Sequence, residues 1–278
     1  RGWPARWVGA VWLLPLVLVR PPTPAAGEAW FTLLDVGQGL AAVVRTQTHT
    51  LVFDTGPRLG TFDTGAAVVE PYLRAVGVRR VDTLIISHGD NDHIGGAESV
   101  LRALPVGEIL SSVPERLPSA RLCRSGQAWS WDGVDFIVMN PAAIGSSRVN
   151  NDSCVLLVHS RYGNVLLPAD IEAKAERQLI ERWGERLRSQ VLVAPHHGSK
   201  TSSTPEFIDA VAPRYVLFPV GYRSRYRHPN AAVVQRYVDR GIARRDSPAS
   251  GALEFRLRAT GLEAMAYREQ HRRYWYAD

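Results

Sequence analysis

The sequence is poor in lysine, cysteine and methionine. Lys174 and Lys200 are the only lysines among 33 basic side chains, so arginine carries nearly all of the net charge of +6. Such a balance favours an anionic partner, either nucleic acid or an acidic membrane surface, although a genome rich in G and C produces the same bias. Two cysteines exclude a zinc ribbon or a disulfide framework; Cys123 and Cys154 could form one bridge or remain as two buried thiols.

Long hydrophobic runs are also scarce, and the one that stands out lies at residues 7–19. It is shorter than the roughly 20 residues of a membrane-spanning helix. We expect residues 1–20 to be the tail of a transmembrane helix, with a signal-peptide core or a buried strand or helix as alternatives. Residues 21–28 predict a stiff, proline-rich linker. A folded domain is expected over residues 29–268, followed by a basic and aromatic tail at 269–278.

No internal repeat or low-complexity tract interrupts the domain, and a hydrophobic content of 45% supports a core. Short apolar runs alternate with amphipathic stretches, which predicts an α/β layered domain. Strands are expected over 30–39, ending in a glycine-rich turn, and near 40–45, 50–54, 81–87, 107–112, 133–138, 153–159, 163–168, 190–194, 214–219 and within 243–267. Helices are expected near 67–76, 95–104, 171–188, 204–211 and 230–240, with a polar loop at 57–66. Polar residues directly follow several strands, the arrangement of a site at one edge of a sheet sandwich.

Four side chains of metal-ligand type lie within six residues, directly after the buried strand expected at 81–87. They are His88, Asp90, Asp92 and His93. For any one of them a polar surface loop is the simpler interpretation. The whole set predicts a metal site, because a tight loop can turn two imidazoles and two carboxylates toward one divalent cation. Gly95 and Gly96 follow and would admit a close backbone approach.

Two other strand ends carry the residues that such a site needs. Asp170 follows one apolar strand and could bridge two cations, or could cap the next helix. His196 and His197 follow another strand. Because consecutive side chains on extended backbone point in opposite directions, we expect one of these histidines to be functional and the other structural.

Together these segments resemble the metallo-β-lactamase superfamily. The run at 88–93 is similar to its HxHxDH signature, with Asp90 in place of the second histidine, and Asp54-Thr55-Gly56, Asp170 and the His-His-Gly-Ser run match the remaining motifs in order. More narrowly, LDVGQG, SHGDNDHIGG, NDSCVL and PHHGSKTSS resemble the C-terminal domain of the ComEC family of DNA-uptake channels, over roughly residues 30–258. The motifs begin at residues 34, 87, 151 and 195.

The resemblance implies a metallo-β-lactamase αββα sandwich holding two divalent cations, with Asp54 and Gly56 in structural roles. The first cation is expected on His88, Asp90 and Asn151, and the second on Asp92, His93, Asp170 and His197. His197 is preferred to His196 as a ligand, because the histidine before glycine is the usual ligand in related motifs. We expect Asp90, Asp92 and His196 to be catalytic, with Asp90 or His196 handling the proton of the leaving group.

Departures from the superfamily pattern affect the choice of metal. No histidine occurs from 94 to 158, so the third histidine of the first metal site is missing, and Asn150 or Asn151 is its best substitute. Such an oxygen-rich site accepts Mn²⁺ or Mg²⁺ as readily as Zn²⁺. Ala169 stands where the family has glycine, which is tolerated if its φ is negative.

A basic and aromatic cluster follows the strand expected at 214–219. It consists of Arg214, Arg223, Arg225, Arg227 and His228, interleaved with Tyr215, Tyr222 and Tyr226. Of these, Arg223, Arg225 and Tyr226 are expected to bind substrate, since arginine meets phosphate and tyrosine stacks on unpaired bases. A solvated loop with its aromatic side chains folded inward is the alternative. Ser199, Thr201 and Ser202 could add hydroxyl contacts to phosphate, or simply build a turn.

The sequence therefore predicts a metal-dependent nuclease that hydrolyses the non-transforming strand of incoming DNA during natural transformation. It would lie on the periplasmic side of a bacterial inner membrane, joined to the membrane-embedded remainder of the channel, with no organic cofactor. Two alternatives remain: a small-molecule ester or phosphoester hydrolase of the lactonase or phosphorylcholine-esterase type, and a non-catalytic DNA-binding domain. A β-lactamase is disfavoured because the tri-histidine zinc site is incomplete.

Overall fold

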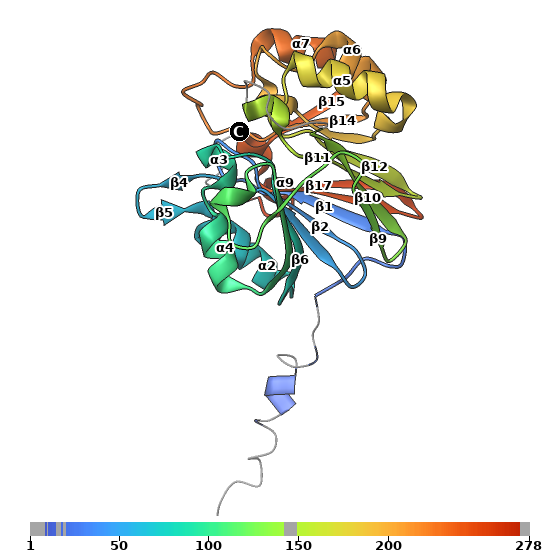
Figure 1. Ribbon diagram of the computed structural model, residues 1–278. Coiled ribbons are helices and arrows are strands. Elements are labelled where there is room, and N and C mark those ends of the chain that lie inside the picture. The colour runs from blue at the N-terminus through green and yellow to red at the C-terminus, as the bar shows by residue number, and fades with distance from the viewer. Residues whose placement is uncertain (1–8, 10, 15–17, 19–20, 142–148, 273–278) are drawn as a thin grey trace, which may run out of the picture.

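Two β-sheets packed face to face form the centre of the fold in this computed structural model, which describes residues 9, 11–14, 18, 21–141 and 149–272 (Figure 1). The first sheet has the strand order β17-β16-β1-β2-β3-β6-β7-β8. In chain order its strands are β1 (Ala29–Leu33), β2 (Ala42–Arg45), β3 (Thr50–Phe53), β6 (Val81–Ile86), β7 (Val106–Ser111), β8 (Arg121–Leu122), β16 (Leu253–Arg258) and β17 (Gly261–Ala266).

The second sheet has the strand order β15-β14-β13-β12-β11-β10-β9. Its strands are β9 (Ala128–Trp131), β10 (Val134–Asn140), β11 (Val155–Ser160), β12 (Gly163–Leu167), β13 (Val191–Val193), β14 (Tyr215–Phe218) and β15 (Ala243–Asp246). β12, β13, β14 and β15 run parallel to one another. Their carboxyl ends therefore meet at one edge, and this is the edge to which Asp170 and the two histidines at 196–197 belong.

Helices cover the outer face of each sheet (Figure 1). The π-helical turn η1 (Gly65–Val69), α2 (Glu70–Ala75) and α4 (Ala97–Ala103) pack on the first sheet. α5 (Ala173–Trp183), α6 (Pro205–Val211) and α7 (Ala231–Val238) pack on the second. Alternate residues of β11 show the result: Leu156 and Val158 join the core between the sheets, while Val155 and Leu157 join the core under the helices. The predicted αββα sandwich is confirmed.

The element predictions hold with a few exceptions. The expected polar loop at 57–66 contains a small hairpin, β4 (Arg58–Leu59) and β5 (Phe62–Asp63), and β8 and β9 were not anticipated. The helix expected at 171–188 ends at Trp183, because Gly184 adopts a positive φ of 46° there, and a 3₁₀ turn η4 (Gly184–Leu187) continues it. Short helices at the end of the domain are α8 (Ser247–Ser250) and α9 (Tyr267–Gln270), and α9 occupies the start of the expected tail.

The two ends of the chain are described only in part. Among the described residues, no helix is long and apolar enough to cross a membrane. Most of the expected membrane segment at 1–20, and residues 273–278 of the expected tail, lie outside the described part of the chain.

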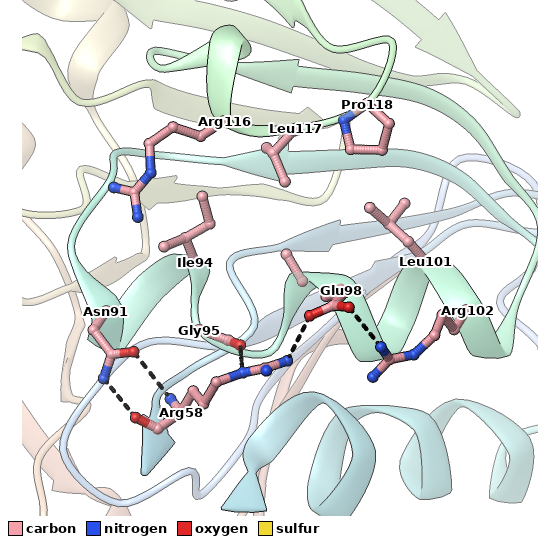
Figure 2. Close-up of a pocket in the computed structure, with 11 residues that line it drawn as sticks. Arg58, Asn91, Ile94, Gly95, Glu98, Leu101, Arg102, Arg116, Leu117 and Pro118 are labelled. Carbon is pink, nitrogen blue, oxygen red and sulfur yellow. Dashed lines mark hydrogen bonds and ion pairs between the residues drawn. The ribbon is translucent and has the colours of Figure 1, made fainter. Parts of the chain in front are cut away.

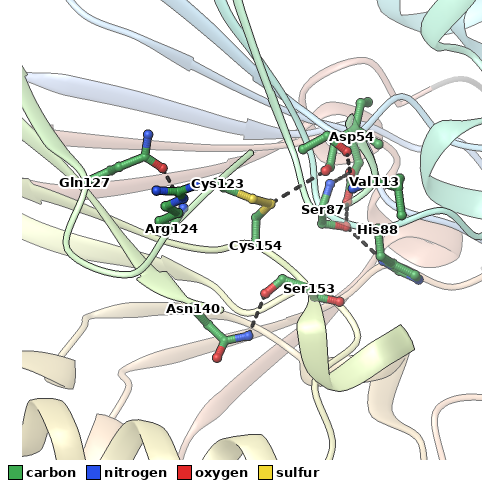
Figure 3. The surroundings of a disulfide bond; sticks show 12 residues. Asp54, Ser87, His88, Val113, Cys123, Arg124, Gln127, Asn140, Ser153 and Cys154 are labelled. Carbon is green, nitrogen blue, oxygen red and sulfur yellow. Dashed lines mark hydrogen bonds between the residues drawn. A yellow bond between two sulfur atoms is a disulfide. The ribbon is translucent and has the colours of Figure 1, made fainter. Parts of the chain in front are cut away.

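Cys123 and Cys154 form a disulfide, which answers a question that the sequence left open (Figure 3). Cys123 directly follows β8 of the first sheet, and Cys154 directly precedes β11 of the second. Each cysteine is also anchored through its backbone, since Cys123 N donates to Ser111 O at 3.0 Å and Cys154 N donates to Ser87 O at 2.9 Å. The bond therefore links the two sheets beside the loop that begins at His88.

Candidate metal centre

Four predicted ligands meet at the edge of the sandwich: Asp92, His93, Asp170 and His197. One potential ligand atom of each lies within 4.8 Å of the others. His93 Nε2 is 3.1 Å from Asp170 Oδ1 and 3.2 Å from His197 Nε2. His197 Nε2 is 3.3 Å from Asp92 Oδ2 and 3.4 Å from Asp170 Oδ2. This set is the one expected to hold the second cation.

A short helix and a tight turn position the first two of these ligands. α3 (Asn91–Ile94) begins five residues after the end of β6 and presents Asp92 and His93. Its backbone docks on the 54–56 turn, where Thr55 N donates to His93 O at 2.8 Å and Gly96 N donates to Gly56 O at 3.1 Å. Gly56 has a φ of +70°, and a Cβ there would overlap the hydroxyl of Thr64. The structural role expected of Gly56 is consistent with this contact.

Hydrogen bonds to the far ring nitrogens orient both histidines. His93 Nδ1 lies 2.7 Å from Asp54 Oδ2, and His197 Nδ1 lies 2.9 Å from the carbonyl oxygen of Pro219. A carbonyl oxygen only accepts, so His197 Nδ1 carries the proton, and in the neutral ring Nε2 then offers its lone pair to the cluster. Metal-binding histidines are typically held by such contacts.

Asp54 is itself locked in place, as its expected structural role requires. It is fully buried, and its two carboxylate oxygens accept hydrogen bonds from Ser87 N at 2.7 Å and Ser87 Oγ at 2.6 Å (Figure 3). Its φ of 57° places the residue in the left-handed region, which aspartate tolerates better than most residues. One carboxylate thus fixes both the strand end at Ser87 and the ring of His93.

Without a metal, the four side chains form a network of ion pairs. Burial alone would lower the pKa of His197, but the carboxylate of Asp170 and the contact with Asp92 outweigh it and raise that pKa to about 9. Burial likewise opposes ionisation of Asp92, yet the hydrogen bond from His197 and the charge of His93 lower the pKa of Asp92 to about 2. Two carboxylates and two basic nitrogens in this space form a donor set that suits a divalent cation.

His88 and Asp90, expected at the first cation, lie next to this cluster. The His88 ring is 4.1 Å from the His93 ring between centroids, and His88 Nε2 is 3.5 Å from Asp90 Oδ2. His88 Nε2 is buried with no hydrogen-bond partner, while Ser87 Oγ holds Nδ1 at 3.0 Å. A buried, unpaired nitrogen is costly unless a further group, such as a cation, binds there. The residues present therefore fit a metal at this position as well.

Asn151, the third ligand expected at the first cation, has a different set of contacts. It is buried in the 3₁₀ turn η3 (Val149–Asp152), and its Oδ1 accepts a hydrogen bond from Glu172 N at 3.0 Å. Asn140 Nδ2 donates to the backbone oxygen of Asn151 at 2.9 Å. The first contact holds the backbone two residues after Asp170, so a metal would have to share an oxygen of Asn151 that is already engaged.

The two adjacent histidines do not have the extended backbone that the sequence analysis assumed. His196 and His197 lie in the 3₁₀ turn η5 (Pro195–Gly198) with φ values of 49° and 54°, so their backbone is left-handed rather than extended. Both rings therefore approach Asp170 Oδ2, His197 at 3.4 Å and His196 at 3.7 Å. The prediction that one histidine would point away is wrong, whereas the preference for His197 as the ligand agrees with the geometry. His196, expected to be catalytic, is the more exposed of the two.

Ala169 does not have the negative φ under which an alanine at this position was expected to be tolerated. Its φ is 51°, a backbone conformation that favours glycine, and its methyl group packs in the core between the sheets. The turn at Ala169 is held by a hydrogen bond from His196 N to Ala169 O at 2.9 Å. This bond places the loop that carries Asp170 beside the loop that carries His197.

A groove of about 740 Å³ leads from the metal loop to the basic and aromatic cluster. Its lining joins Asp90 and Asp92 to the three residues expected to bind substrate, Arg223, Arg225 and Tyr226. The rings are open to solvent, with Tyr222 76% and Tyr226 54% exposed, and the guanidinium group of Arg225 lies 4.8 Å over the ring of Tyr226. Tyr222 and Tyr226 are therefore not folded inward as the alternative supposed, whereas Tyr215 packs against the core between the sheets.

The three hydroxyl residues near His197 differ in accessibility. Thr201 is exposed and its Oγ1 lies 3.4 Å from His196 Nδ1, and Ser199 Oγ lies 3.1 Å from Thr201 Oγ1. Ser202 is fully buried and donates to the carbonyl oxygen of Ile171 at 2.8 Å. The expectation that Ser202 binds substrate is therefore wrong, because its hydroxyl holds the turn together.

A second pocket, of about 580 Å³, lies on the other side of α3 (Figure 2). Arg58, Arg102 and Arg116 line it together with the apolar side chains of Ile94, Leu101, Leu117 and Pro118. These arginines are already engaged: Arg58 and Arg102 both bind Glu98, and Arg116 donates to the backbone oxygen of Gly89. None of the four clustered ligands lines this pocket, so the metal chemistry belongs to the groove.

Sequence reasoning missed three residues at this site. Ser87 and Gln38 act through hydrogen bonds: Gln38 Oε1 accepts from Ser224 Oγ at 2.8 Å and from Gly221 N at 3.3 Å, which ties the basic loop to the first motif. His228, counted only as part of the basic cluster, lies beside the metal centre, where burial and the nearby His197 and His196 lower its pKa. The position of Gln38 between two glycines in the LDVGQG motif was the signal in the sequence that could have identified it.

Comparisons with known proteins agree with this arrangement. A model of the family described as the Metallo-beta-lactamase superfamily matches residues 34–221. The chain is 41% identical to Competence protein ComA of Neisseria gonorrhoeae, over 95% of this chain and 37% of that protein. It is 32% identical to Recombination protein 2 of Haemophilus influenzae, over 88% of this chain and 31% of that protein. The chain thus spans about a third of the length of these relatives, and the predicted resemblance to competence proteins is confirmed.

Solved structures support the fold. A metallo hydrolase from Ignicoccus hospitalis matches 81% of this chain and 98% of its own with a TM-score of 0.57 at 19% identity. A putative metal-dependent hydrolase from Parabacteroides distasonis matches 78% of this chain and 92% of its own with a TM-score of 0.52 at 12% identity. At these identities the comparison concerns the fold alone.

Proposed function

Because the chain belongs to the metallo-β-lactamase superfamily, we propose that it is a metal-dependent phosphodiesterase that cleaves DNA, as the nuclease domain of a DNA-uptake channel. The observation that carries this proposal is the continuity of the groove. Asp92 belongs both to the cluster of four ligands and to a groove whose other wall carries arginine and exposed tyrosine. A small, enclosed ester substrate would need neither the length nor the charge of this groove.

The residues divide the work in a way that fits phosphodiester hydrolysis. Asp92, His93, Asp170 and His197 would hold one cation and His88 with Asp90 a second, with Zn²⁺ and Mn²⁺ as the leading candidates. Divalent cations supply Lewis acidity, which lowers the pKa of water and stabilises the charge that develops on phosphate oxygens. Arg223 and Arg225 bind flanking phosphates, and Tyr226 stacks on an unpaired base. Asp90, whose side chain is 57% exposed, and His196 accept or deliver protons at the mouth of the site.

Two features support a place at the outer side of a membrane. The relatives are named for competence and recombination, and this chain matches about a third of each. The disulfide between Cys123 and Cys154 favours an oxidising compartment such as the periplasm, since cytosolic disulfides are rare. We therefore propose that the domain acts on the non-transforming strand of DNA as it arrives at the channel.

A cleavage assay with matched variants tests the proposal. Single-stranded DNA is incubated with the purified chain and Mn²⁺, Zn²⁺ or EDTA, beside Asp170→Asn and the control Asp209→Asn, whose carboxylate pairs with Arg240 on the surface. Cleavage is expected with metal, to disappear with EDTA, and to fall by roughly a thousandfold or more in Asp170→Asn only. Tight DNA binding without cleavage under any metal would favour a non-catalytic domain. Hydrolysis of a lactone or phosphorylcholine ester, with DNA left intact, would favour the small-molecule enzyme.

A further inference from the structure

His228 lies between the basic loop and the metal centre. Its ring centroid is 6.0 Å from that of His196 and 6.4 Å from that of His197, and it stacks on Tyr226 at 6.1 Å with an interplanar angle of 24°. His228 thus lies close both to the two histidines at the metal centre and to Tyr226, which lines the groove.

The position of His228 is held by the turn that carries His197. Asn230 N donates to Gly198 O at 2.9 Å, and the Asn230 side chain caps α7 through Ala232 N at 3.0 Å. A Cβ at Gly198 would lie 2.8 Å from the Cβ of Pro229, so the two backbone segments pack as closely as glycine allows. The backbone that carries His228 is therefore held in place, which reduces the freedom lost when the residue binds a ligand.

The two nitrogens of His228 have different surroundings. Nδ1 is buried without a hydrogen-bond partner. Nε2 is not among the buried atoms and has no partner within the described structure. A buried N–H without a partner costs more than a buried lone pair, which favours the proton on Nε2. His228 therefore carries an N–H donor that is not buried and has no partner, on a ring that stacks on Tyr226 of the groove lining.

We propose that His228 is a further substrate-binding residue, whose Nε2–H donates a hydrogen bond to a non-bridging oxygen of the phosphate held at the metal centre. This inference rests on the proposed function, because it assigns a phosphate group to that site. Phosphate oxygens are acceptors only, and a neutral imidazole donor fits them without adding a charge next to the cations. The remaining phosphates of a DNA strand would continue toward Arg225 along the same groove.

Binding of inorganic phosphate to the Mn²⁺-loaded chain tests this assignment without turnover. Calorimetry compares the wild type with His228→Ala, His228→Gln and the control His159→Ala; His159 is exposed on β11 and bonded to Asn164. We expect His228→Ala to weaken phosphate binding by roughly tenfold, as for one lost hydrogen bond to an anion. His228→Gln should recover part of the affinity through its amide N–H, with Mn²⁺ affinity unchanged in every variant.

Other results would overturn the inference. Phosphate affinity in His228→Ala equal to that of the wild type would exclude the contact, as would a matching loss of Mn²⁺ affinity, which would make His228 a metal ligand. Absence of phosphate binding to the loaded wild type would also exclude it. DNA cleavage is measured in parallel on the same samples. If phosphate binding depends on His228 but the wild type cleaves no DNA, the proposed nuclease function fails while this contact stands.

Discussion

At the scale of the residue, side chains outside the cluster of candidate metal ligands orient the side chains within it. Asp54 accepts hydrogen bonds from Ser87 N and Ser87 Oγ and contacts His93 Nδ1 at 2.7 Å. All three partners act as donors to the carboxylate, so no isosteric amide can satisfy them together. The orientation of the His93 ring therefore depends on the position of the Asp54 carboxylate.

Replacing that carboxylate should weaken metal binding from a distance. Asp54→Asn is expected to lower Mn²⁺ affinity by roughly 10- to 100-fold, as for other residues that orient metal-binding histidines. Titration calorimetry measures the affinity. The matched control is Asp63→Asn, which loses a carboxylate bonded to Ala66 N and Ser99 outside the cluster. Equal Mn²⁺ affinity in Asp54→Asn and the wild type would refute the orienting role.

The titration of the same residues predicts the stability of the metal-free protein. The pKa of His197 is raised from 6.5 to about 9 in the folded chain, so its contribution is complete below 6.5 and is lost as the pH rises through 9. The pKa of Asp92 is lowered from 3.8 to about 2, so its contribution is complete above 3.8 and is lost as the pH falls through 2.

The combined contribution of His197 and Asp92 to the stability of the metal-free chain is therefore expected to be greatest between about pH 4 and 6.5. Thermal unfolding in EDTA across pH 4 to 10 measures this, with His197→Gln as the comparison that should lose the decline at alkaline pH. Mn²⁺ affinity should show the opposite trend and rise toward pH 9, because the cation must displace the proton from His197. A flat melting temperature from pH 6 to 10 would contradict the assignment.

At the scale of the element, the loop at 221–226 works because another motif holds it. Gln38, from the turn after β1, accepts hydrogen bonds from Gly221 N and Ser224 Oγ. A loop held at both points keeps Arg223 and Arg225 on the groove rather than free in solvent. Its two arginines are therefore expected to bind phosphates at defined positions.

Salt dependence tests this role of the loop. Arg223→Ala combined with Arg225→Ala should reduce the slope of log affinity for single-stranded DNA against log salt by roughly 0.7 per arginine. Fluorescence anisotropy in EDTA measures binding without cleavage. Arg244→Ala with Arg245→Ala is the matched control, since both arginines are exposed on the edge strand β15. The same slope change in both pairs would indicate that only total charge matters.

The sequence anticipated most elements correctly, because their hydrophobic patterns are local. β6 ends in an apolar run at residues 84–86 and is buried on both faces. β9 has an alternating exposed and half-buried pattern that was not distinguished from a turn. The left-handed turn at His196 and His197 had no comparable signal, since histidine is enriched at positive φ but adopts other backbone conformations far more often.

At the scale of the whole molecule, the sandwich depends on contacts between its two sheets. The Cys123–Cys154 disulfide joins them beside the metal loop, across a sequence separation of 31 residues (Figure 3). Because Cys154 N also bonds Ser87 O, the same link supports the strand end that leads into His88. Stability and the geometry of the site are thus connected through one bond.

Removal of this bond should destabilise the chain. Cys123→Ser with Cys154→Ser is expected to reduce the free energy of unfolding by about 4 kcal/mol, from the entropy of a closed loop of this length. Denaturant unfolding of oxidised wild type and the double variant measures the difference, and reduced wild type should match the variant. A difference below about 1 kcal/mol would mean that sheet packing alone holds the two layers.

The sequence by itself determined the layered α/β class and the strand ends that carry polar residues, because periodicity and residue type are local properties. Its resemblance to a known superfamily indicated Asp92, His93, Asp170 and His197 as candidate ligands, and the structure brings these four together. Only the tertiary structure decided that both histidines at 196–197 face Asp170, that the two cysteines are bonded, and that His228 lies beside the centre. Each of these depends on the order of strands in the sheets, which brings together segments far apart in the chain, such as His93 and His197, 104 residues apart.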